Sequence, residues 1–152
     1  MLNVAVVGYG YWGPNLVRNF VEAPESEVVM VADISEANLK RVSSRYPAIQ
    51  TTTSVDDIYN NNGIDAVVIA TPVNTHYELA LNALQSGKHV MVEKPMASSS
   101  EQAKHLIQEA QSRNLVLMVD HTFVYTGAVR KIANLVREGE LGDVLYYDST
   151  RI

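Results

Sequence analysis

The sequence contains no cysteine, which excludes a disulfide scaffold and any metal site built from thiolates. It also lacks long apolar runs: hydrophobic residues make up 47% of the chain, but they occur in short blocks that end at glycine, aspartate or amphipathic stretches. A membrane span needs about 20 consecutive apolar residues, so none is expected. Basic residues are outnumbered, with 12 Lys and Arg against 17 Asp and Glu, and they form no stripe, which argues against a nucleic-acid-binding surface.

The N-terminus lacks the pattern of a secretory signal, because a strand-like run begins at Leu2 without a basic region or a long apolar stretch. Together with the absence of cysteine, this predicts a cytoplasmic protein. The 152 residues are enough for one domain with a substantial core, whereas two full domains would be crowded.

The most informative stretch is GYGYWG at residues 8–13, a G-x-G-x-x-G that directly follows the apolar run 4–7. In a strand-to-helix turn the first glycine permits the bend, the second lets the backbone approach a pyrophosphate, and the third lets helix pack on strand. Pro14 suits the first position of the next helix, where its missing N–H costs nothing. The N–H groups and partial positive charge of that helix end suit the two phosphates of a dinucleotide.

A second apolar run, residues 28–32, ends at Asp33, which lies 20 residues after Gly13. This is the expected position of a carboxylate that binds the ribose hydroxyls of a dinucleotide. The alternative is that Asp33 caps the helix that follows it. No arginine is adjacent to receive a 2′-phosphate, so NAD is favoured as the cofactor and NADP stays possible.

Short apolar runs alternate with amphipathic stretches, the pattern of a parallel sheet covered by helices on both faces. Strands are predicted near residues 2–7, 27–32, 48–51, 65–70, 88–92 and 115–119. Helices are predicted at about 13–22, 35–46, 54–60, 75–86, 98–113 and 126–138. Right-handed crossovers then give an α/β fold, a doubly wound Rossmann sheet of strand order 3-2-1-4-5-6, with ligand over the carboxyl ends of the strands.

The loop after the fourth predicted strand should border the nicotinamide side of the crevice and contains Thr71, Pro72 and Asn74. Thr75 could also begin the next helix, with Glu78 completing a capping box. His76 would lie in the first turn of that helix, where the macrodipole disfavours a protonated ring. Its neutral ring would either contact the cofactor or face solvent.

Glu93-Lys94-Pro95 places an acid and a base at the end of a buried strand, and the Lys94–Pro95 bond could be cis. A lysine in a dry crevice can stabilise the alkoxide that develops as hydride leaves a carbinol carbon. The alternative is an exposed loop with solvated charges. His121 follows the sixth predicted strand and could approach the substrate, although an ordinary hydrogen-bonded histidine is the commoner outcome.

Motifs at five places, in this order, resemble the nucleotide-binding domain of the glucose-fructose oxidoreductase/inositol dehydrogenase/MocA family. The motifs are GYGYWGPN at 8–15, ADIS at 32–35, ATPVNTH at 70–76, GKHVMVEKP at 87–95 and DHTFVY at 120–125. The resemblance covers essentially the whole chain. Its wording is most similar to bacterial members that oxidise sugar nucleotides or related sugars.

The resemblance implies an NAD(P)-dependent dehydrogenase that transfers hydride between nicotinamide and a hydroxyl carbon of a small sugar or sugar nucleotide. Lys94 would take part in catalysis, and no metal is expected. The resemblance assigns cofactor binding to Gly8, Gly10, Tyr11, Trp12, Gly13, Asp33, Thr71, Pro72, Asn74, His76, Glu93 and Lys94.

The C-terminal part departs from the family pattern, whose members have a second α/β domain that covers the substrate and builds the oligomer. The dinucleotide-binding domain is predicted over residues 1–122, and residues 123–152 are predicted to hold a linking helix and one strand, 143–152. The chain is therefore expected to be truncated, to bind cofactor, and to turn over poorly without the histidine base of the second domain. The full-length protein is expected to be a homo-oligomer through that domain.

Two other functions stay open. One is a non-catalytic module that senses NAD or acts as a scaffold, in which Glu93 and Lys94 are incidental. The other is a methyltransferase that uses S-adenosylmethionine, which shares the glycine loop and the acid after the second strand but leaves residues 87–95 unexplained. Neither nucleic acid nor membrane is expected as a partner.

Overall fold

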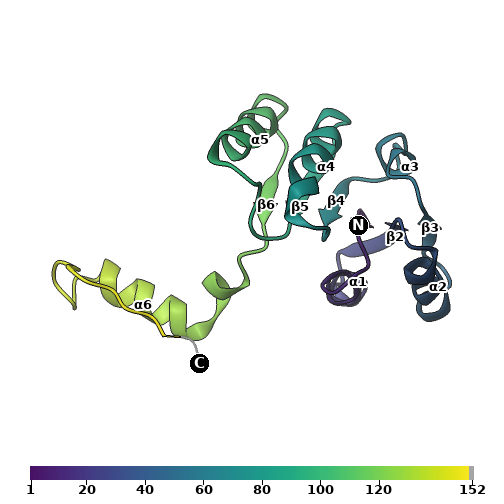
Figure 1. Cartoon of the computed structure of the whole chain (residues 1–152). Helices are drawn as coiled ribbons and strands as arrows, with labels where there is room; N and C mark the ends of the chain where they lie inside the picture. The colour runs from purple at the N-terminus through teal and green to yellow at the C-terminus, as the bar shows by residue number, and fades with distance from the viewer. Residues whose placement is uncertain (151–152) are drawn as a thin grey trace. The chain divides into compact units, whose positions relative to one another are not determined.

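The computed structural model describes residues 1–150 (Figure 1). Contacts divide it into a unit from Met1 to Asp120 and a second unit that begins at His121. The first unit contains, in chain order, β1 (Leu2–Val7), α1 (Gly13–Glu22), β2 (Ser26–Ala32), α2 (Glu36–Arg45), β3 (Gln50–Thr52), α3 (Asp56–Tyr59), β4 (Ala66–Ile69), α4 (Val73–Gln85), β5 (His89–Val92), α5 (Ser100–Ser112) and β6 (Leu117–Val119).

The six strands form one sheet of order β3-β2-β1-β4-β5-β6, and every neighbouring pair is parallel. The predicted doubly wound fold is therefore confirmed. After β3 the chain crosses from one edge of the sheet to place β4 beside β1. This reversal brings the loops after β1 and β4 together at the carboxyl edge, where such sheets bind ligands.

Helices cover both faces of the sheet, with α1 and α2 on one side and α4 and α5 on the other (Figure 1). Alternate residues of a strand pack against the two helical layers, because successive side chains in a strand point to opposite faces of the sheet. Val67 and Ile69 pack in the core that contains Leu84 of α4 and Leu106 of α5. Val68 packs instead with residues of α1 and α2. Burial on both faces explains why β4 is continuously apolar.

The start of α4 differs from the prediction. The helix begins at Val73, its N-cap residue is Pro72, and no side chain caps it. The Thr75 hydroxyl donates to the Pro72 carbonyl oxygen at 2.8 Å and shares a 2.7 Å hydrogen bond with the Thr71 hydroxyl. The predicted capping box of Thr75 and Glu78 is therefore wrong. Pro72, at φ −62° and ψ 145°, ends the extended segment itself, so the helix starts two residues earlier.

The second unit contains a 3₁₀ helix, η1 (Thr122–Tyr125), and one α-helix, α6 (Gly127–Arg137). The strand predicted over 143–152 is not formed over 143–150, and residues 151–152 lie outside the described range. An extended segment becomes a strand only when its backbone pairs with another, and residues 143–150 have no such partner here. No helix within residues 1–150 is long and apolar enough to span a bilayer.

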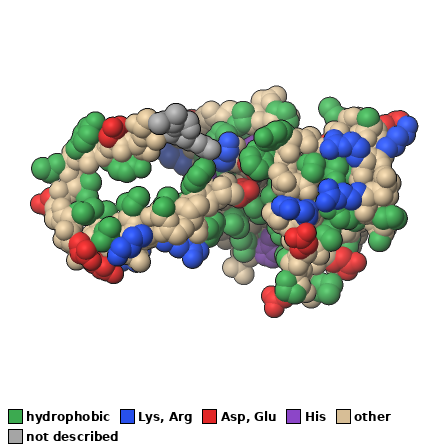
Figure 2. Space-filling model, turned by 90° about the horizontal axis from the view of Figure 1, so that it is seen from below, with side chains coloured by type: hydrophobic (Ala, Val, Ile, Leu, Met, Phe, Trp, Pro, Cys, Tyr) green, Lys and Arg blue, Asp and Glu red, His purple; other side chains and the backbone are tan. Residues whose placement is uncertain are grey.

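Figure 2 shows one face of the molecule, on which Lys and Arg side chains lie interspersed with acidic and hydrophobic ones. Charges of both signs are thus mixed on this surface.

Lys88, just before β5, is a buried cation that the sequence reasoning did not single out. Its side-chain ammonium donates to the carbonyl oxygens of Asn61 at 2.7 Å and Ile64 at 3.0 Å, which ties β5 to the loop before β4. Burial lowers the pKa of Lys88, and the charge of Asp65 partly opposes this shift. These two hydrogen bonds hold the amino end of the sheet, opposite the expected ligand edge.

Replacing Lys88 with Met should therefore keep the apolar stem but remove the ammonium donor. The Ile64 carbonyl loses this donor, whereas the Asn61 carbonyl still accepts the Ile64 N–H at 3.2 Å. We expect the free energy of unfolding to fall by about 1–3 kcal/mol, the usual cost of a buried unsatisfied polar group, in urea titrations. Lys104→Met, on the exposed surface of α5, is the matched control and should change stability by less than about 0.5 kcal/mol. Equal effects of both substitutions would contradict the assigned role of Lys88.

Candidate functional site

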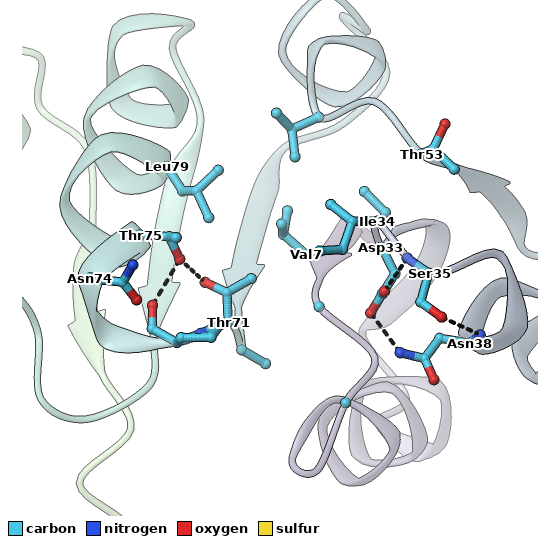
Figure 3. A pocket seen from close by; sticks show the side chains of 16 residues that line it. Val7, Asp33, Ile34, Ser35, Asn38, Thr53, Thr71, Asn74, Thr75 and Leu79 are labelled. Carbon is cyan, nitrogen blue, oxygen red and sulfur yellow. Dashed lines mark hydrogen bonds between the residues drawn. The ribbon is translucent and has the colours of Figure 1, made fainter.

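A cavity of about 620 Å³ opens at the carboxyl ends of β1, β2 and β4. Its size lies within the range of small-molecule sites. The glycine loop contributes Gly8 and Gly10, and the other walls come from the segments after β2, β3 and β4. Figure 3 shows Asp33 and Asn38 on one side of this cavity and Thr71 with Thr75 on the other. The cavity therefore occupies the position that the strand order predicts for a ligand.

The structure requires glycine at two of the three motif positions, for different reasons. Gly8 has φ +95°, and a Cβ there would lie 2.9 Å from the Ala70 carbonyl oxygen at the end of β4. A Cβ at Gly13 would lie 2.1 Å from the Gly8 carbonyl oxygen, so the start of α1 touches the turn itself. A Cβ at Gly10 would meet nothing within 4 Å. Packing within the fold therefore accounts for glycine at positions 8 and 13. At Gly10, no part of the described chain fills the space where a side chain would stand.

The Asp33 carboxylate is fixed by backbone and side-chain donors from two elements. Its Oδ2 accepts the Tyr9 N–H of the glycine loop at 2.6 Å and the Asn38 side-chain amide at 3.2 Å. Its Oδ1 accepts the Ser35 N–H at 2.7 Å. Ser35, not Asp33, is the N-cap residue of α2, so the capping alternative for Asp33 does not hold. Asp33 instead ties the glycine loop to the start of α2 at the cavity edge.

Asn38 is a contributor that the sequence reasoning missed. It lies in the first turn of α2, lines the cavity and supports Asp33 directly. The only available signal was a polar residue one turn after the predicted ribose-binding acid.

The aromatic residues of the glycine loop divide between core and surface. Tyr9 is buried in the core beside α1 and α2, and burial raises the pKa of its phenol. Tyr11 and Trp12 are 86% and 46% exposed and form an edge-to-face pair with ring centroids 5.4 Å apart. Neither of these two residues lines the cavity. Their assignment to cofactor binding stays a prediction.

Four site residues were predicted in the loop after β4 and at the start of α4. Three of them line the cavity, and the fourth does not. Thr71, Pro72 and Asn74 line the cavity together with Thr75. His76 is 1% exposed and lies outside the lining, with both ring nitrogens 2.8 Å from backbone carbonyl oxygens. The ring therefore has no free nitrogen for a cofactor.

Glu93-Lys94-Pro95 forms a charged turn after β5, and the Lys94–Pro95 peptide is cis. Glu93 is 8% exposed, and its carboxylate accepts the Lys94 backbone N–H at 3.2 Å. The Lys94 side chain is exposed, and within residues 1–150 its ammonium makes no hydrogen bond or ion pair. Neither Glu93 nor Lys94 lines the cavity, so their places in a cofactor site stay predictions.

Glu93 shares its surroundings with Asp120, which follows β6. Burial raises the pKa of Glu93, and a hydrogen bond with Asp120 and the charge of that carboxylate raise it further. The Lys94 backbone N–H and the Lys94 charge oppose this shift. The ends of β5 and β6 thus hold two interacting carboxyl groups directly beside Lys94.

His121 begins the second unit and is exposed there, and its predicted contact with substrate stays untested. Among residues 1–150, no group of three or more His, Asp or Glu side chains is arranged to hold a metal ion.

Comparison with known proteins identifies the family. The model of the glucose-fructose oxidoreductase/inositol dehydrogenase/MocA oxidoreductases, described as an oxidoreductase family with an NAD-binding Rossmann fold, matches residues 2–121. The chain belongs to this family. The resemblance drawn from the motifs is therefore confirmed, and so is an NAD-binding domain.

Relatives of this oxidoreductase domain are longer than the chain, which spans about 40% of their length. An uncharacterised oxidoreductase of Streptococcus pneumoniae is 30% identical, with 99% of this chain and 40% of the relative aligned. The scyllo-inositol 2-dehydrogenase (NADP(+)) IolW of Bacillus subtilis is 28% identical, with 96% of this chain and 40% of the relative aligned. A 2,7-anhydro-N-acetylneuraminate hydratase of Mediterraneibacter gnavus is 30% identical, with 97% of this chain and 38% of the relative aligned.

Solved structures agree on the fold. GenD2 from gentamicin A biosynthesis, in complex with NAD, matches with a TM-score of 0.86 and 30% identity over 91% of this chain and 40% of its own. A mutant of KijD10, a 3-ketoreductase from Actinomadura kijaniata in complex with TDP-benzene and NADP, matches with a TM-score of 0.83 and 26% identity. The match covers 94% of this chain and 46% of the KijD10 chain. Related domains thus bind either NAD or NADP.

Two glycine substitutions should separate folding from binding. Gly13→Ala should lower the free energy of unfolding by more than about 3 kcal/mol, because its Cβ would collide with the Gly8 backbone. Gly10→Ala should fold with stability within about 1 kcal/mol of the parent, yet bind NADH at least about tenfold more weakly, because its methyl group would occupy the space where the motif predicts the pyrophosphate. Urea titration and NADH titration measure the two effects, and unchanged NADH affinity in Gly10→Ala would contradict this assignment.

The buried acid Glu93 should make stability depend on pH. Because its pKa is raised above the ordinary 4.5 by folding, the folded chain binds more protons than the unfolded chain between these two values. The parent should therefore lose stability relative to Glu93→Gln as the pH rises through that interval, measured by urea unfolding at a series of pH values. Glu101→Gln is the control of opposite sign, because hydrogen bonds from its own backbone N–H and from Ser100 lower the pKa of Glu101. Parallel pH profiles for the two variants would refute the prediction.

Proposed function

We propose that this chain binds NAD(H) across the glycine loop and forms the nicotinamide-binding half of a dehydrogenase acting on a sugar or sugar nucleotide. The observation that carries the proposal is the pairing of an Asp33 carboxylate, held by the Tyr9 N–H, with the unfilled space at Gly10. The two features flank one cavity and suit a ribose diol and a pyrophosphate respectively.

The helix that follows the loop supports a pyrophosphate site. Ser35 and Ser99 cap α2 and α5, whereas α1 has no side-chain cap and begins at Gly13 and Pro14. Pro14 has no N–H, and the Asn15 N–H already donates to the Trp12 carbonyl oxygen at 2.9 Å, so the Gly13 N–H is the leading amide of α1 that is open to a ligand. The macrodipole favours negative charge at this end of the helix.

The remaining cavity wall suits an adenine ring. Ile34, Val55 and Leu79 supply apolar side chains to the lining of the cavity. Figure 3 shows Ile34 beside Asp33 and Leu79 on the opposite wall, near Thr75. A flat aromatic base packs well between such side chains while its ribose lies against the carboxylate. The loop with Thr71 and Asn74 would then lie toward the nicotinamide half.

Lys94 is the residue proposed to act in the reaction. The cofactor supplies the hydride acceptor at its nicotinamide ring. The Lys94 ammonium, which makes no ion pair among residues 1–150, would donate a hydrogen bond to the substrate hydroxyl oxygen and stabilise negative charge as hydride leaves the carbon. The hydroxyl proton must go to a base, which the family resemblance places in a second domain. We therefore expect little turnover from the 152 residues alone.

The relatives agree with this substrate class in different degrees. IolW is named for an inositol, and KijD10 was crystallised with a thymidine diphosphate ligand and NADP, which favours polyols and sugar nucleotides. The hydratase of Mediterraneibacter gnavus acts on a sugar by a different net reaction, so NADH formation and product formation both need to be measured.

NADH titration tests the proposal directly, and Trp12 is a built-in reporter because it is the single tryptophan and lies in the glycine loop. We expect saturable quenching of Trp12 fluorescence by NADH. Asp33→Ala should weaken binding at least about tenfold, equivalent to about 1.4 kcal/mol. Asp56→Ala, an exposed acid at the start of α3, is the matched control and should bind as the parent does. Absence of saturable binding by the parent would refute the proposal.

Lys94→Ala separates an enzyme from a sensing module in the same series. It should keep NADH affinity within about threefold, since Lys94 does not line the cavity. In any longer polypeptide that contains these residues, it should remove most of kcat with sugar or sugar-nucleotide substrates. Undiminished turnover in Lys94→Ala would favour the non-catalytic alternative.

A further inference from the structure

His76 connects two loops that are distant in sequence. Its side chain is 1% exposed, in the first turn of α4. One ring nitrogen, Nε2, lies 2.8 Å from the Thr71 carbonyl oxygen, and the other, Nδ1, lies 2.8 Å from the Pro95 carbonyl oxygen. Thr71 lines the cavity, and Pro95 directly follows Lys94. The ring therefore bridges the cavity wall and the charged turn.

The chemistry of the two contacts is unusual for a buried histidine. Carbonyl oxygens only accept hydrogen bonds, so a ring that bonds to both must donate from both nitrogens. A neutral ring donates from one nitrogen only and turns a lone pair toward the other carbonyl. Burying a polar ring costs free energy unless its polar atoms have partners, and each nitrogen of this ring faces a carbonyl oxygen of one of the two loops.

Other side-chain links between these loops are weak. In the described part of the chain, the other side-chain hydrogen bond between residues 71–76 and 93–98 runs from the Ser98 hydroxyl to the Val73 carbonyl oxygen at 3.5 Å. The turn is otherwise joined to β4 through the sheet, where the Glu93 N–H donates to the Ile69 carbonyl oxygen at 2.9 Å. Beyond the end of the sheet, His76 is thus the main polar connection.

We propose that His76 is a positioning residue that holds the Lys94-Pro95 turn against the Thr71 loop, rather than a ligand of the cofactor. The ring holds the backbone at Thr71 on one side of the crevice and at Pro95 on the other. Lys94 is held in position because Pro95 directly follows it in the chain. The functional part of this inference rests on the role proposed above for Lys94. The structural part, the bridge itself, does not.

The experiment is ¹⁵N relaxation of the amides of Thr71, Lys94 and Met96 in the whole chain without cofactor. His76→Phe keeps an aromatic ring but removes both donors. In the parent the order parameters should be about 0.85, as in rigid backbone, and in His76→Phe those of Lys94 and Met96 should fall below about 0.6. Leu84→Ala, about two turns further along α4 in the core, is the control for a general loss of stability and should leave Lys94 and Met96 rigid.

A spectroscopic signature separates the bridge from simple packing. The parent should show a ring N–H signal of His76 protected from exchange with water, and His76→Phe should lack it. His76→Gln, which keeps one amide donor group, should leave one of the two loops rigid, and it serves in place of His76→Phe if that variant does not fold. Unchanged order parameters at Lys94 and Met96 in His76→Phe, or at Thr71, Lys94 and Met96 together in His76→Gln, would overturn the proposal.

NADH titration of the same variants distinguishes the two hypotheses. His76→Phe should weaken NADH binding by about threefold to tenfold through the loosened Thr71 loop, whereas Leu84→Ala should not. If the parent does not bind NADH, the proposed function fails, while the relaxation measurements still decide the bridge. If the parent binds NADH but Lys94 stays rigid in His76→Phe, the bridge fails and the proposed function stands.

Discussion

The contact between Gly13 and the Gly8 carbonyl is the constraint on which the rest of the structure depends. It joins the end of β1 to the start of α1 so closely that no side chain fits between them. Between these two glycines, the space where a side chain at Gly10 would stand is open. The contact between Gly13 and Gly8 also places the Tyr9 N–H where the Asp33 carboxylate accepts it, so Asp33 and the glycine loop are positioned by one turn.

The reversal of strand order places a second loop opposite this turn. Because β4 lies beside β1, the loop after β4 forms the opposite wall of the same cavity, and Gly8 packs against the Ala70 carbonyl with no room for a side chain. The turn after β5 lies one strand further along. His76 connects it to the β4 loop through hydrogen bonds that are independent of the sheet ladder. The proposed cofactor wall and the proposed reactive lysine thus belong to one hydrogen-bonded arrangement.

Much of the fold could be predicted from the sequence because its signals are local. The apolar runs ending at Gly8 and Asp33 mark β1 and β2, and the β-branched run at 67–69 marks a strand buried on both faces. The boundary of α4 was predicted two residues late, because Thr75 offered a capping pattern that Pro72 makes unnecessary. The strand expected near the C-terminus does not form over residues 143–150, because an apolar extended pattern does not by itself supply a pairing partner.

The sequence by itself determined the family, the strand order and the cavity-lining residues Gly8, Gly10, Asp33 and Thr71, because spacing along the chain places them at strand ends. Only the tertiary structure decided how each of them is held. Asn38 supports Asp33, Glu93 interacts with Asp120, and His76 turns away from the cavity to bond two carbonyls. These contacts depend on which backbone groups lie opposite one another across different strands, and no pattern within one segment of sequence records that.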